Sequence, residues 1–146
     1  MQGGVRCAKN LVMVKTPRAF LHAARLADAV LFWPVLAYVL WGQLQPDVPR
    51  LLEGINDKLL HFSAYFVLGA MAGGALRQPG SVKWAVLGLI VVGAAVEVIQ
   101  AYVGRETSVL DAVANCAGAI AGALLARFVL DPLRRRWGYD TDTPSA

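Results

Sequence analysis

Residues 84–103 read WAVLGLIVVGAAVEVIQAYV, an apolar run that is interrupted near its end by Glu97 and Gln100. An α-helix needs about 20 mostly apolar residues to cross the hydrocarbon core of a bilayer, so this run is predicted to be a transmembrane helix. The composition of the whole chain supports this prediction, because 57% of its 146 residues are hydrophobic and only 16% are charged. A soluble domain of this length needs more polar surface, so the sequence indicates an integral membrane protein.

Three further apolar segments have membrane-spanning length, at about Leu26–Leu44, Leu59–Leu76 and Val109–Leu130. Short polar turns, Gln78–Ser81 and Gly104–Thr107, separate the last three spans. Ser108, with Asp111 three residues later, forms a capping-box pattern that is typical of a helix start. The predicted fold is therefore all-α, an integral membrane bundle of four transmembrane helices.

The chain is predicted to have three parts: a basic segment at 1–25, a four-span membrane domain at 26–130 and a polar tail at 131–146. The basic segment surrounds a short apolar stretch, Leu11–Val14, and two interpretations stay open for it. It is either an interfacial amphipathic helix or a disordered basic tail, and Met13 is an alternative start.

Orientation follows from the 14 Lys and Arg residues. Eleven lie on the side that holds both termini and the turn between spans two and three: Arg6, Lys9, Lys15, Arg18, Arg25, Arg77, Lys83, Arg127, Arg134, Arg135 and Arg136. Three lie on the other side: Arg50, Lys58 and Arg105. The positive-inside rule predicts a multi-pass protein of the cytoplasmic (inner) membrane with both termini cytoplasmic. Because the bases flank apolar spans, the net charge of +4 indicates contact with membrane lipids and not with nucleic acid.

Eight polar residues fall at the outer end of this predicted bundle: Asp57, Lys58, His61, Glu97, Gln100, Arg105, Asp111 and Asn115. Asp57, His61 and Tyr65 are spaced by four and share one helix face. Below the polar end, Gly69-x-x-x-Gly73 and Gly118-x-x-x-Gly122 predict closely packed helices. The pattern predicts a tight bundle whose outer end holds a polar cavity.

Glu97 is the most informative member of this set, because it lies roughly 9 Å inside its span at 1.5 Å per residue. Facing lipid it would cost on the order of 2 to 3 kcal/mol, so it is expected to face Lys58, His61 or Arg105. Structural roles compete for the other residues. The acids at helix starts also stabilise the helix dipole, and buried amides also join helices by hydrogen bonds.

Four motifs occur in order between Ile55 and Leu125: Asp57-Lys58-Leu59-Leu60-His61-Phe62 followed by Tyr65, Glu97-Val98-Ile99-Gln100, Gly104-Arg105, and Asp111-Ala112-Val113-Ala114-Asn115 with Gly118. In these motifs and their spacing, the chain resembles the VanZ-like membrane proteins. It implies a protein of the cell envelope, in a family named after a protein linked to low-level teicoplanin resistance. The family's biochemical activity is not established, so the resemblance implies no reaction.

Three functions are compatible with these residues. The first is binding of a lipid headgroup or phosphate-bearing ligand, such as a lipid-linked cell-wall precursor, by Asp57, Lys58, Tyr65, Gln100, Arg105 and Asn115. The second is a membrane enzyme that uses His61 and Glu97 for acid–base chemistry on a lipid-linked substrate, with Asp111 positioning it. The third is a purely structural bundle.

No cofactor is predicted, and no metal, because the sequence lacks a helical His-x-x-x-His or similar ligand pair. The two cysteines, Cys7 and Cys116, indicate neither a disulfide nor a metal site. The oligomeric state stays open.

Overall fold

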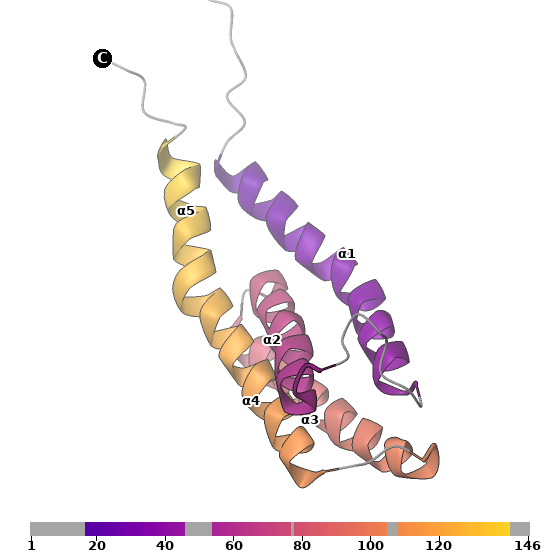
Figure 1. Cartoon of the computed structure of the whole chain (residues 1–146). Coiled ribbons are helices and arrows are strands. Elements are labelled where there is room, and N and C mark those ends of the chain that lie inside the picture. Colours follow the sequence, from indigo (N-terminus) through magenta and orange to yellow (C-terminus); the bar gives the residue numbers. More distant parts are fainter. Residues whose placement is uncertain (1–16, 46–53, 77, 105–107, 141–146) are drawn as a thin grey trace, which may run out of the picture.

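The computed structural model describes residues 17–45, 54–76, 78–104 and 108–140, and every regular element in these ranges is helical (Figure 1). The elements are α1 (Pro17–Gln43), α2 (Asp57–Ala75), α3 (Pro79–Tyr102), α4 (Val109–Leu125), the π-helical segment η2 (Ala126–Leu130) and α5 (Asp131–Asp140). Since α4, η2 and α5 follow one another without a break, the chain forms four long rods. The predicted all-α class is confirmed.

Three of the four rods are long and apolar enough to cross a membrane, at Phe20–Gln43, Pro79–Tyr102 and Val109–Arg136. The remaining rod, α2, has 19 residues and carries Asp57, Lys58 and His61 in its first turns. Its length is about 28 Å at 1.5 Å per residue, close to the thickness of the hydrocarbon core. Its position among α1, α3 and α4 (Figure 1) completes the predicted four-helix membrane bundle.

Two predicted boundaries fall inside continuous helices. Helix α1 begins at Pro17 and not near residue 26, while Leu11–Val14 lies outside the described residues. The predicted polar tail at 131–146 is helical as far as Asp140. Both extensions are explained by packing, because the early part of α1 and the first turns of α5 contact each other through paired charges.

The closest packing in the bundle joins α2 to α4. A Cβ atom added at Gly118 would meet the carbonyl oxygen of Phe62, and one added at Gly122 would meet that of Phe66. From the other side, a Cβ at Gly69 would meet the Ala119 carbonyl. The predicted glycine motifs therefore lie at one interface, where only glycine allows the two backbones to approach.

The interior below the polar end is small and apolar. Its buried cluster contains Tyr65, Leu68, Leu89 and Ala119, with partly buried residues of α1 packed against it. Large apolar side chains, including Trp33, Trp84 and Leu124, are exposed on the outside. Lipid in place of water accounts for such an exterior.

The π-helical segment has a local cause in Pro132. A proline has no N–H to donate to the carbonyl four residues earlier, and its ring clashes with that carbonyl. The wider turn accommodates it, and the Asp131 N–H bonds instead to the carbonyl of Ala126. Ala126 and Asp131, five residues apart, consequently both lie on the buried side.

Candidate functional site

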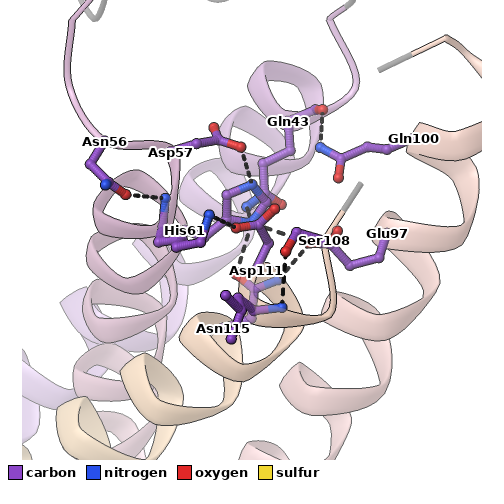
Figure 2. Close-up of polar contacts among 11 residues, drawn as sticks. Gln43, Asn56, Asp57, His61, Glu97, Gln100, Ser108, Asp111 and Asn115 are labelled. Atoms are coloured by element: carbon purple, nitrogen blue, oxygen red, sulfur yellow. Dashed lines mark hydrogen bonds and ion pairs between the residues drawn. The ribbon is translucent and has the colours of Figure 1, made fainter. Parts of the chain in front are cut away.

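The polar residues gather at one end of the bundle, where α1 and α3 end and α2 and α4 begin (Figure 1). We call this group the polar site; its members are Gln43, Asp57, Lys58, His61, Glu97, Gln100, Asp111 and Asn115. Figure 2 shows labelled side chains from all four helices turned toward one another. Seven of the eight residues that the sequence placed here do meet, and the eighth, Arg105, lies outside the described residues.

Local capping explains why α2 and α4 begin at this level. The Asn56 side chain accepts a hydrogen bond from the Lys58 backbone N–H at 3.0 Å. The Ser108 hydroxyl accepts one from the Leu110 N–H at 3.2 Å, at the helix start that the Ser108–Asp111 pattern predicted. Each cap satisfies an N–H that the first helical turn leaves without an intrahelical partner. The two starts place Asp57 and Asp111 side by side on adjacent helices.

His61 lies at the centre of the polar site and is only 2% exposed. Its Nδ1 is 3.1 Å from Asn115 Oδ1, 3.3 Å from Gln43 Nε2 and 3.4 Å from Glu97 Oε1. Its Nε2 is 3.7 Å from Asp57 Oδ2, beyond hydrogen-bonding distance. One imidazole thus touches side chains from α1, α3 and α4 in addition to its own helix.

Asn115 connects His61 to Glu97. Its Nδ2 donates to Glu97 Oε1 at 3.5 Å, and its Oδ1 lies 3.1 Å from His61 Nδ1. A protonated Nδ1 donates to Asn115 Oδ1, whereas an unprotonated Nδ1 accepts from Gln43 Nε2 at 3.3 Å. The two tautomers of His61 therefore use partners from different helices, α4 and α1.

Asp111 is a buried carboxylate with incomplete compensation. It is 3% exposed, and its Oδ1 accepts no hydrogen bond within the part of the chain that the structure describes. Lys58 Nζ lies 3.6 Å from this oxygen, on a side chain that is 46% exposed. A buried charge is costly unless it is paired and hydrogen-bonded, so Asp111 is held at some cost.

Gln100 connects α3 to the end of α1. Its Nε2 donates to the backbone carbonyl of Gln43 at 2.6 Å, and the Gln100 side chain is almost fully buried. Gln43 itself was not predicted as a site residue. At the end of an apolar span a glutamine has the pattern of a solvated interfacial residue, and only the tertiary packing places it against His61.

Tyr65 shares the helix face of Asp57 and His61, as predicted, but it belongs to the apolar core and not to the site opening. It is fully buried, with its ring against Gly93. Its hydroxyl has no hydrogen-bond partner among the described residues. A direct contact with a ligand at the opening is therefore the least supported of the predicted roles.

The charge of the polar site is negative among the described residues. Three carboxylates, those of Asp57, Glu97 and Asp111, face a single ammonium group, that of Lys58. Ligand atoms of Asp57, His61 and Asp111 all lie within 4.8 Å of one another. Within the described part of the chain, carboxylates therefore outnumber cationic side chains at the polar site.

A second charged group lies at the opposite end of the bundle, and sequence reasoning did not identify it. Arg25 Nη2 is 3.6 Å from Asp131 Oδ2, and Arg134 Nη1 is 2.7 Å from Asp28 Oδ2. The signal in the sequence was Asp28, an acid inside the first predicted span. We call these contacts the α1–α5 ion pairs.

Comparison with known proteins gives one match. Residues 4–130 match the family model described as VanZ/LLP1, which covers most of the chain. No curated protein and no solved structure matches it. The match includes α1, α2, α3, α4 and η2 and every residue of the polar site.

Proposed function

The chain belongs to the VanZ/LLP1 family, and from its polar site we propose that it is a cell-envelope protein that binds a phosphate-bearing lipid headgroup. The protein is membrane-embedded, and the proposal places it in the inner membrane with both termini in the cytoplasm. The polar site then faces outward, where lipid-linked cell-wall precursors are handled.

One observation carries this proposal: the helix ends that hold the polar site also carry exposed apolar side chains. Leu59 on α2, Tyr102 on α3 and Val109 on α4 are all exposed, the last two by 86% and 82%. They lie within a few residues of Asp57, Glu97 and Asp111. A ligand with a polar head and apolar tails fits both surfaces, whereas a fully water-soluble ligand uses only the first.

Lys58 supplies the positive charge for a headgroup phosphate, because its side chain is half exposed at the edge of the polar site. By its position between α3 and α4 in the sequence, Arg105 is proposed as a second donor. The three carboxylates favour a headgroup that carries a cationic group beside its phosphate over a bare phosphate.

The test compares membrane lipids and lipid-linked wall precursors in cells that lack the protein and in complemented cells. Complementation uses the unaltered chain, Glu97→Gln, and Leu124→Ala as a lipid-facing control. We expect one phosphate-bearing lipid to change on deletion and to be restored by the unaltered chain and the control alone. Teicoplanin susceptibility of the same strains tests the link that the family name suggests. Identical lipid profiles, with Glu97→Gln made at normal levels, would refute headgroup binding.

Acid–base catalysis is a second candidate, favoured by the 3.4 Å contact between His61 Nδ1 and Glu97 Oε1. A buried imidazole beside a partly buried carboxylate can pass a proton to a bound substrate. An enzyme should lose nearly all product formation in both His61→Gln and Glu97→Gln while the protein remains folded. A binding protein should retain ligand in His61→Gln with weakened affinity.

A further inference from the structure

We propose that Asp57, His61 and Asp111 form a binding site for one divalent metal cation, either Mn²⁺ or Zn²⁺. Asp57 and His61 lie one turn apart on α2, and Asp111 projects from the first turn of α4. Their ligand atoms lie within 4.8 Å of one another. One imidazole nitrogen and two carboxylate oxygens form a ligand set that suits these metals.

The bond lengths are within reach of small side-chain rotations. Bonds of about 2.0–2.2 Å in a tetrahedral site place neighbouring ligand atoms about 3.4 Å apart. His61 Nε2 and Asp57 Oδ2 are already 3.7 Å apart. His61 and Asp111 are held by burial, whereas the Asp57 side chain is 37% exposed and can adjust. The remaining coordination positions would be left for water or a ligand phosphate.

The surroundings of His61 match those of a metal-bound histidine. Such a residue usually donates its other ring N–H to a carboxylate or carbonyl group, which orients the ring. Here Nδ1 lies 3.1 Å from Asn115 Oδ1 and 3.4 Å from Glu97 Oε1, two oxygens that would accept this N–H when Nε2 binds a metal. Nε2 is left free of hydrogen bonds to described residues and is directed toward Asp57 (Figure 2).

A second observation points to a bound cation. Asp111 is 3% exposed, and its buried Oδ1 accepts no hydrogen bond from the described residues. A buried carboxylate oxygen is costly unless positive charge or a hydrogen-bond donor lies against it.

Lys58 provides an alternative explanation of how the negative charge of Asp111 is balanced. Its ammonium lies 3.6 Å from Asp111 Oδ1, so Lys58 and a metal would compete for the same oxygen. If Lys58, together with a protonated His61, supplies the whole positive charge, then removing Lys58 creates no metal site. If a metal binds, Lys58 turns outward, and removing it strengthens metal binding.

The experiment uses the full chain in detergent or lipid nanodiscs, with Cys7→Ser and Cys116→Ser to exclude thiol ligands. Mn²⁺ alone is titrated and followed by calorimetry and by its electron paramagnetic resonance signal. We expect one saturable site, weakened at least about tenfold by His61→Gln and by Asp57→Asn. Lys58→Gln is expected to tighten binding severalfold.

Asp57→Asn keeps the result interpretable if His61→Gln fails to fold, because Asp57 is partly exposed whereas His61 is buried. No saturable binding by the unaltered chain would overturn the proposal, and so would binding that His61→Gln and Asp57→Asn leave unchanged. The titration contains no lipid headgroup, so it tests metal binding alone. If no metal binds, the lipid-profile test of the proposed function is unaffected. If the lipid profiles do not change, the metal titration is equally unaffected.

Discussion

Arg134 Nη1 lies 2.7 Å from Asp28 Oδ2 and joins α5 to α1 across 106 positions of the chain. The two side chains are 21% and 17% exposed, so the pair is largely removed from solvent. The ion pair lies against Gly74 of α2, where an added Cβ atom would meet the Asp28 carboxylate. A glycine near the end of α2 therefore makes room for a charge pair between the first and last helices.

This pair predicts a stability effect far from the polar site. Arg134→Ala leaves the partly buried Asp28 carboxylate without its partner, so we expect a loss of about 1–3 kcal/mol. The measurement is equilibrium unfolding in mixed detergent micelles. Arg135→Ala removes a neighbouring exposed arginine and serves as the control. Equal stabilities of the two variants would show that the pair contributes nothing.

The interface between α2 and α4 predicts a steric effect of one methyl group. Gly122→Ala places its Cβ against the Phe66 carbonyl, so the helices must separate or tilt. We expect a lower unfolding temperature and reduced expression, with a cost of about 1–3 kcal/mol that is typical of overpacking. Gly88→Ala, where no atom lies within 4 Å, should be neutral or stabilising. Thermal unfolding of both variants measures the difference.

Substitution of Gln100 is predicted to destabilise only the end of α1. In Gln100→Leu the Gln43 backbone carbonyl loses its 2.6 Å donor within a buried site. Leaving such an acceptor unsatisfied costs about 1–3 kcal/mol. Hydrogen exchange at the end of α1 should increase, while exchange at the α1–α5 contact stays unchanged. Uniformly faster exchange along α1 would instead indicate that the whole helix had loosened.

Substitution of Tyr65, unlike the three changes above, is not expected to lower the stability of the protein. Its buried hydroxyl has no partner among the described residues, so Tyr65→Phe removes an unsatisfied polar group. We expect stability to be unchanged or raised by about 1 kcal/mol. Calorimetric unfolding of the variant measures this. A clear destabilisation would mean that the hydroxyl has a partner in the functioning protein, and it would return Tyr65 to the ligand-binding residues.

The membrane class, the four helices and the meeting of polar residues at one bundle end were predictable from the sequence. Each depends on local properties: apolar runs of spanning length, turns between them, and polar residues near helix ends. In an antiparallel bundle such ends meet by necessity. The glycine motifs were equally informative, because a helix stripe without side chains has few uses other than close packing.

Contacts that depend on the rotation of one helix about its axis were not predictable. The sequence placed His61 among several polar residues, but it did not show that Nδ1 would face Asn115 and leave Nε2 toward Asp57 and Asp111. It also gave no reason to join Asp28 to Arg134, because the apolar pattern ended before α5 while the helix continued. By itself, then, the sequence determined that this is a four-helix membrane protein with a polar end. Only the tertiary structure decided which polar atoms face one another, because shifts of about one ångström in helix packing decide whether two groups make contact.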